Sequence, residues 1–164
     1  QRTGAQLIAN FEICNWVSAK GHENVHAMNT GGGYNFPFGR VKMTAALHSS
    51  GLPDGSYGGD PGGFLVTADG KTVYIAGDTA LFSDMALIGR AGIDLAILPV
   101  GDNFTMEPED SVLALEYLKP KTVIPCHYNT WPPIAIDVAA WAETVKKETT
   151  VSPVVLMVDE THTL

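Results

Sequence analysis

Short apolar runs separated by turn-forming residues are the main feature of the chain, and they are typical of strands in a layered fold. Residues 41–47 alternate between apolar and polar side chains, as expected for a strand with one buried face. Residues 95–98 are continuously apolar, which predicts a buried strand. Asp69-Gly70 between two such runs predicts a hairpin turn. The predicted strands span residues 7–9, 41–47, 64–66, 72–75, 95–98, 122–124 and 154–158, with a further short one at 161–164.

Segments with helical periodicity lie between several of these strands. One of them starts at Pro108 and has acidic residues in its first turn, which is usual at a helix N-terminus. Residues 31–33, all glycine, and Pro37 indicate a long polar loop, and the glycine-rich residues 51–63 indicate another. The predicted helices span residues 12–20, 81–90 (with Ser83 and Asp84 as early caps), 108–118 and 134–147.

Hairpins and strand–helix alternation occur together, which predicts a layered α/β fold with two sheets and helices outside them. The length of 164 residues suits a single domain over residues 1–164. A Rossmann fold is disfavoured because no Gly-x-Gly-x-x-Gly follows a predicted strand.

Composition narrows the classes of partner. The formal charge is −8, and no basic cluster could neutralise a nucleic-acid backbone, so we expect no nucleic-acid partner. The two cysteines, Cys14 and Cys126, lack metal-type spacing, and free thiols fit a reducing cytoplasm. No apolar run approaches the roughly eighteen residues that span a bilayer. We therefore expect a cytoplasmic protein with no membrane partner.

Three residues that could bind a metal stand directly after apolar strands: His48, Asp78 and His127. Strand ends at one sheet edge can direct side chains from distant positions toward one point. Imidazole nitrogen with carboxylate oxygen is the ligand set of a hydrolytic zinc, manganese or iron site. Each residue also has an ordinary interpretation, since a histidine there can be a hydrogen-bonded loop residue and Asp78 can cap a helix near Leu81. Spacing alone leaves both interpretations open.

Four motifs in order carry a resemblance to a known family: Ala-Leu-His-Ser-Ser-Gly (46–51), Ile-Ala-Gly-Asp-Thr (75–79), Gly-Asp-Asn-Phe-Thr-Met (101–106) and Ile-Pro-Cys-His-Tyr-Asn-Thr (124–130). As a set they resemble the metallo-β-lactamase superfamily, and within it the metal-dependent hydrolases similar to L-ascorbate-6-phosphate lactonase. The resemblance implies a four-layer αββα sandwich. It covers residues 4–164 and corresponds to the C-terminal portion of that fold.

The resemblance also implies roles for individual residues. His48 matches the third histidine of a first metal, Asp78 the carboxylate that bridges two metals, and His127 the last histidine of the second metal. One or two divalent ions (zinc, or manganese or iron) would then activate a hydroxide for hydrolysis of a lactone, phosphodiester or related ester, a small-molecule substrate. Asp78 is thus also a catalytic candidate. Tyr128 and Asn129, which follow a ligand, are candidates to face the substrate or a developing oxyanion, with ordinary loop packing as the alternative.

The family's His-x-His-x-Asp-His motif does not occur in residues 1–164, so the fold is expected to be incomplete at its N-terminus. The expected partner is a complementing N-terminal fragment that carries this motif, and a homo-oligomer is also allowed. His22 and His26 do not have the matching spacing and are interpreted as exposed loop histidines, and His162 as incidental. The alternative function is a non-catalytic structural half-domain, or fragment, with vestigial metal residues.

Several neighbouring residues have two interpretations. Ser49 and Asp102 either orient the imidazoles or form turns. Trp131, before Pro132-Pro133, is interpreted as core or rim packing rather than a stacking platform. Glu107 departs from the glycine expected in the relatives, so the local loop geometry is expected to differ there.

Overall fold

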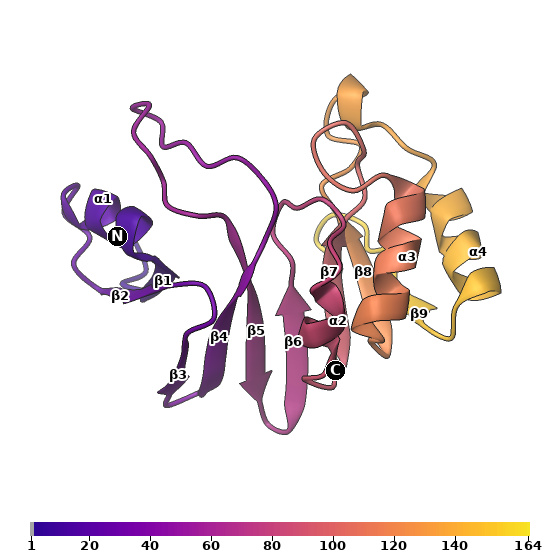
Figure 1. Ribbon diagram of the computed structural model, residues 1–164, viewed down its shortest axis with the longest axis horizontal. Coiled ribbons are helices and arrows are strands. Elements are labelled where there is room, and N and C mark those ends of the chain that lie inside the picture. Colours follow the sequence, from indigo (N-terminus) through magenta and orange to yellow (C-terminus); the bar gives the residue numbers. More distant parts are fainter. Residues whose placement is uncertain (1) are drawn as a thin grey trace.

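The computed structural model describes residues 2–164, and a mixed seven-stranded sheet is its central element (Figure 1). The strands lie in the order β3-β4-β5-β6-β7-β8-β9. Strands β3 to β6 pair antiparallel, whereas β6 to β9 pair parallel. The strands are β3 (Gly33–Phe36), β4 (Gly39–Ala45), β5 (Gly62–Ala68), β6 (Lys71–Ile75), β7 (Leu95–Pro99), β8 (Thr122–Cys126) and β9 (Ser152–Pro153).

Three helices connect the parallel strands and cover one face of the sheet. They are α2 (Met85–Gly89), α3 (Pro108–Leu118) and α4 (Val138–Glu148), and they gather around β7 to β9 (Figure 1). Tyr74, Ala96 and Val123 are register neighbours on β6, β7 and β8 whose side chains share this face, and all are fully buried. Leu118 of α3 is buried in the same cluster. This main core fixes the three strands that lead to the predicted metal residues.

The opposite face of the sheet is covered only in part. Strand β1 (Leu7–Asn10) and strand β2 (Val25–Met28) form a separate two-stranded parallel sheet, connected by α1 (Phe11–Ser18). With β3, β4 and β5 they enclose a small apolar cluster that contains Met28 and Met43. Register places Ile75, Ile97 and Ile124 in one row beyond it, and none of the three belongs to an apolar cluster. Ile75 is exposed and Ile97 and Ile124 are half-buried, and we call this incompletely covered row over β6 to β8 the uncovered apolar face.

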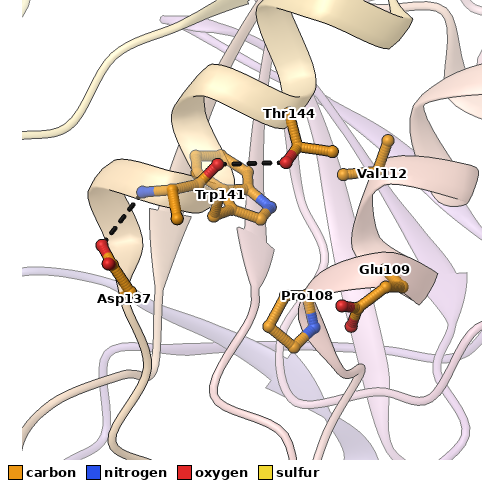
Figure 2. A pocket seen from close by; sticks show the side chains of 7 residues that line it. Pro108, Glu109, Val112, Asp137, Trp141 and Thr144 are labelled. Carbon is orange, nitrogen blue, oxygen red and sulfur yellow. Dashed lines mark hydrogen bonds between the residues drawn. The ribbon is translucent and has the colours of Figure 1, made fainter.

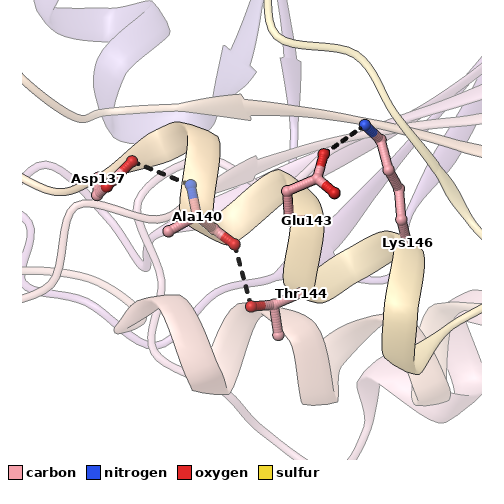
Figure 3. Close-up of polar contacts among 5 residues, drawn as sticks. All are labelled: Asp137, Ala140, Glu143, Thr144 and Lys146. Atoms are coloured by element: carbon pink, nitrogen blue, oxygen red, sulfur yellow. Dashed lines mark hydrogen bonds and ion pairs between the residues drawn. The ribbon is translucent and has the colours of Figure 1, made fainter.

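Local signals fix the ends of the two long helices. Pro108 occupies the first turn of α3, and the helix has the predicted bounds 108–118. The α4 helix begins at Val138, later than predicted, because the Asp137 side chain accepts hydrogen bonds from the backbone N–H groups of Ala139 and Ala140 at 3.1 and 3.0 Å (Figure 3). A short 3-10 turn, η1 (Pro132–Ile134), precedes it. No helix among residues 2–164 is long and apolar enough to cross a membrane.

Several predicted elements differ from the structure. The polar loop predicted around residues 31–33 and Pro37 contains all of β3, which pairs with the next strand, β4; β2, which pairs with β1, lies just before these glycines. The helix predicted at 81–90 is only α2, and Asp84, at its N-cap, makes no side-chain capping bond. The strands predicted at 154–158 and 161–164 are absent from the described residues; β9 ends at Pro153, which lacks an N–H for further pairing. The αββα prediction holds in the arrangement of layers, with the second sheet limited here to β1 and β2.

Asp94 connects the N-terminal ends of β6, β7 and β8 through hydrogen bonds. It also makes the stability of the fold depend on pH. Its side chain is 10% exposed and accepts hydrogen bonds from Lys121 Nζ and the Thr72 N–H, each at 2.8 Å. The hydrogen bond from Lys121, with that from the Thr72 backbone, lowers the pKa of Asp94. A carboxylate with a lowered pKa stabilises the fold above its unfolded pKa, and this contribution disappears as the pH falls through the folded pKa.

We therefore expect the melting temperature of the wild-type protein to fall more steeply than that of Asp94→Asn when the pH is lowered below about 4. Thermal melts followed by circular dichroism from pH 7 to pH 3 measure this. Asp84→Asn is the matched control, since Asp84 is exposed. Parallel curves for wild type and Asp94→Asn would contradict the assignment.

Candidate metal centre

Asp78 and His127 lie together at the carboxyl ends of β6 and β8. Strand β7 lies between these strands and is parallel to both, so the segments that leave β6 and β8 emerge at the same sheet edge. Asp78 Oδ2 is 3.7 Å from His127 Nε2. The Asp78 side chain is 48% exposed and that of His127 is 29% exposed, so the pair is reachable from solvent.

Thr79 holds the segment before His48 against the segment that carries Asp78. The Thr79 hydroxyl accepts a hydrogen bond from the Leu47 N–H at 2.9 Å, and the Leu47 carbonyl accepts one from the Ala80 N–H at 3.0 Å. Thr79 is fully buried, and its carbonyl also accepts a hydrogen bond from the Met106 N–H at 3.1 Å. This residue was not singled out in the sequence, although the motif Gly-Asp-Thr contains it.

The His48 side chain is exposed and lies next to this network without joining the Asp78–His127 pair. Its Nδ1 is 2.9 Å from the Ser49 carbonyl oxygen. A carbonyl only accepts hydrogen bonds, so this contact assigns the proton to Nδ1 and leaves the Nε2 lone pair free to bind a metal. Ser49 thus contacts the ring through its backbone carbonyl.

The backbone around His127 is unusual in two respects. His127 has a φ of +55°, in the left-handed region that non-glycine residues seldom adopt. Gly101 packs against its carbonyl, and a Cβ added at Gly101 would lie 1.9 Å from the His127 oxygen. The ring Nδ1 of His127 is buried and has no hydrogen-bond partner within the described chain. Buried polar atoms are normally paired, so this nitrogen is suited to donate a hydrogen bond to a polar group from another segment while Nε2 faces Asp78.

Cys126 also lies near Asp78, but its side chain remains a protonated thiol at neutral pH. Burial, together with the charge of Asp78, raises the pKa of its thiol to about 11. At neutral pH the group stays a thiol, and the thiolate is the form that binds metals and attacks electrophiles. Cys14 is buried, and both cysteines are free, as predicted.

Tyr128 and Asn129 make contacts that favour the loop-packing interpretation. Tyr128 packs against the main core, and burial raises the pKa of its phenol. The Asn129 side-chain oxygen accepts a hydrogen bond from the Ile136 N–H at 2.7 Å, and its backbone N–H donates to the Ile134 carbonyl at 2.8 Å. Both residues thereby shape the loop that follows His127.

The other residues named from the sequence lie in various settings. His26 is not in a loop as predicted; it belongs to β2, and its ring contacts Tyr34 and Phe36. His22 is in a loop but is half-buried, and His162 is exposed. Asp102 has a φ of +59° and its Oδ1 accepts a hydrogen bond from the Asn103 N–H, which is the behaviour of a turn residue.

Within residues 2–164, no three histidine, cysteine, aspartate or glutamate side chains form a group that could hold a metal. The Asp78–His127 pair thus brings together two of the three predicted ligands. A cavity of about 230 Å³ lies between α3 and α4, beside Trp141, and includes none of the predicted metal residues (Figure 2). The candidate centre is instead the open sheet edge above β6, β7 and β8.

The chain is similar in sequence to a known protein family and to several metal-dependent hydrolases. The pattern of the beta-lactamase superfamily domain matches residues 1–128. The chain is 51% identical over 147 residues to a UPF0173 metal-dependent hydrolase of Thermus thermophilus, covering 90% of this chain and 65% of that protein. It is also 51% identical over 152 residues to a UPF0173 metal-dependent hydrolase of Shouchella clausii, covering 89% of this chain and 67% of that protein. The chain thus spans about two thirds of these relatives.

A solved structure shows the same arrangement of elements. Igni18, a metallo hydrolase from the archaeon Ignicoccus hospitalis, superposes with a TM-score of 0.85 at 35% identity, over 94% of this chain and 66% of that one. The matched pattern covers most of the chain and includes His48, Asp78 and His127. The chain therefore belongs to the beta-lactamase superfamily and is similar to its metal-dependent hydrolases.

Proposed function

We propose that this chain forms part of a metal-dependent hydrolase of small esters, with lactones and phosphodiesters as the substrate classes to test first. The approach of Asp78 Oδ2 to His127 Nε2 carries the proposal, because it brings a carboxylate and an imidazole to the edge of a rigid sheet. The names of the relatives support the reaction class.

The geometry of the pair suits a shared cation. Oxygen and nitrogen ligands bind zinc at about 2.0–2.2 Å in a tetrahedral arrangement, so two of them lie about 3.4 Å apart. The observed 3.7 Å needs only a small adjustment. His48, with its free Nε2, is the further ligand that this chain would supply.

A bound divalent ion supplies Lewis acidity, which lowers the pKa of water and polarises a carbonyl or phosphoryl oxygen. The residues of the chain hold and orient this chemistry. Asp78 contributes negative charge, Ser49 fixes the His48 tautomer, and Thr79 keeps the segments before His48 and after Asp78 together. Tyr128 and Asn129 hold the loop that follows His127, through packing on the main core and through hydrogen bonds to the backbone of residues 134 and 136.

We further propose that a segment with the motif His-x-His-x-Asp-His completes the centre. A catalytic zinc usually has three protein ligands, and this chain offers three residues for one or two ions. The uncovered apolar face (Ile75, Ile97 and Ile124) supports a packing partner on that side of the sheet, since exposed apolar patches of this kind mark interaction sites. The greater length of the relatives supports the same idea.

The experiment co-expresses the chain with such a segment, taken from a relative, and measures metal by elemental analysis and activity on a lactone and a phosphodiester. We expect one or two divalent ions per complex and hydrolysis of at least one substrate class. A complex that forms, binds no zinc, manganese or iron and hydrolyses neither substrate would favour the structural half-domain instead.

The uncovered apolar face allows a sharper version of the test. Ile75 is 39% exposed, and we expect Ile75→Lys to prevent capture of the complementing segment in a pull-down, because the interface would bury an unpaired charge. Leu113→Lys is the matched control, since Leu113 is 36% exposed on α3. Equal capture by both variants would contradict packing on this face.

A further inference from the structure

Two aromatic side chains stack at the same sheet edge as the candidate metal centre. The rings of Phe104 and Trp131 have centroids 5.5 Å apart and planes inclined by 15°. Phe104 lies in the loop after β7 and Trp131 in the loop after β8, and Figure 1 shows both loops at one end of the sheet, at the upper right. We call this stacked pair the aromatic ledge.

Backbone hydrogen bonds connect the aromatic ledge to the metal residues. Phe104 is at the tip of a turn closed by the Asp102 N–H, which donates to the Met106 carbonyl at 3.1 Å. The base of this turn is bonded to Thr79, directly after Asp78, through the Met106 N–H. On the other side, Trp131 follows His127 by four residues in a loop that Asn129 closes. The ledge therefore stands beside the Asp78–His127 pair on a preformed support.

Packing does not account for the ledge. Each ring is 49% exposed although it stacks on the other, and neither residue belongs to an apolar cluster of the structure. The second stacked pair, Phe36 and Phe38, differs because Phe36 is buried in the cluster beneath β3 and β4. Exposed aromatic rings forgo the stabilisation that burial would give, and flat apolar surfaces of this kind bind ligands.

We infer that the aromatic ledge binds an uncharged apolar or aromatic group of the substrate and so sets substrate preference. This inference rests on the proposed hydrolase function. The rings offer stacking faces and carry no charge, and Asp102 in the same turn disfavours an anionic group there. The loops are held before binding by the bonds described above, so a substrate loses little affinity to loop ordering. The ester that reacts beside Asp78 and His127 would thus carry an apolar substituent that reaches the ledge.

The first test compares γ-butyrolactone with α-benzyl-γ-butyrolactone in the metal-loaded complex of the chain with the co-expressed His-x-His-x-Asp-His segment. The measured quantity is the ratio of kcat/KM for the benzyl lactone to that for the unsubstituted one. We expect the ratio to fall about three- to tenfold in Phe104→Ala and in Trp131→Ala, the factor that corresponds to one aromatic contact. Phe104→Tyr and Trp131→Phe should keep it. An unchanged ratio in both alanine variants overturns the inference.

Phe38→Ala is the matched control for these variants, because Phe38 is an exposed, stacked phenylalanine at the opposite end of the sheet. It should leave the ratio unchanged. A fall of the same size in Phe38→Ala would mean that the effect does not come from the ledge, and would also overturn the inference.

The second test does not depend on hydrolysis. The indole N–H signal of Trp131 in a two-dimensional NMR spectrum, assigned by its loss in Trp131→Phe, is followed while α-benzyl-γ-butyrolactam is added. We expect a saturable shift with this lactam and none with γ-butyrolactam. If neither lactone is hydrolysed but the shift occurs, lactone hydrolysis fails and the ledge stands. If no shift occurs, the ledge is not a binding site.

Discussion

Replacing Asp78 by asparagine is expected to lower kcat/KM of the completed, metal-loaded protein by about a thousandfold, because a bound cation supplies several kcal/mol of transition-state stabilisation. Asparagine keeps the size of the side chain but removes the charge that faces His127 at 3.7 Å. The metal content of Asp78→Asn should fall together with its kcat/KM. Steady-state kinetics on the hydrolysed substrate and elemental analysis of the same preparation measure both quantities.

Asp84→Asn controls for the loss of one carboxylate, since Asp84 is exposed and makes no capping bond. Full activity and metal content in Asp78→Asn would rule out Asp78 as a ligand. A loss in Asp84→Asn as large as in Asp78→Asn would show that the effect is not specific to the site.

Gly101→Ala is expected to destabilise the protein by about 3 kcal/mol or more, the upper end of the cost of overpacking. The added Cβ would lie 1.9 Å from the His127 carbonyl oxygen, and both groups belong to the backbone support of the site. Relief of this contact requires the loop after β7 to separate from the loop after β8. Urea unfolding monitored by circular dichroism gives the free energy of unfolding, and the metal content should also decrease.

Gly51→Ala is the matched control, since a Cβ added there meets nothing within 4 Å. Neither Gly51 nor Gly101 has a positive φ, so the two substitutions differ only in the space available. Equal stability of the two variants would contradict the close packing of Gly101 on His127.

Features with local signals could be predicted from the sequence. The α3 helix has proline and acidic residues at its start, and the hairpin between β5 and β6 turns at Asp69-Gly70, where both residues have positive φ values. Elements that depend on distant pairing could not be predicted in this way. Strand β2 exists because it pairs with β1, and the apolar residues 154–158 do not form a strand in the structure.

The candidate site also combines residues with local sequence signals and contacts that depend on distant segments. The sequence predicts His48, Asp78 and His127 as metal residues because each follows an apolar strand and matches a family motif. The role of Thr79 depends on hydrogen bonds to residues 32 and 27 positions away, which no local pattern shows. The stacking of Phe104 on Trp131 likewise requires two loops to meet, so the sequence predicts packing for Trp131 and not this contact.

The separation of the aromatic ledge from the metal residues affects how the protein can evolve. Asp78 and His127 follow strand ends closely, whereas Phe104 and Trp131 lie farther out on loops and take no part in strand pairing. Mutations at the two ring positions can therefore change which substrates are accepted while metal binding is retained. Gly101 limits this freedom, because the second residue after β7 is packed against the backbone of His127. Among related proteins, substitutions that change the substrate range should therefore occur at the loop tips and not at the loop bases.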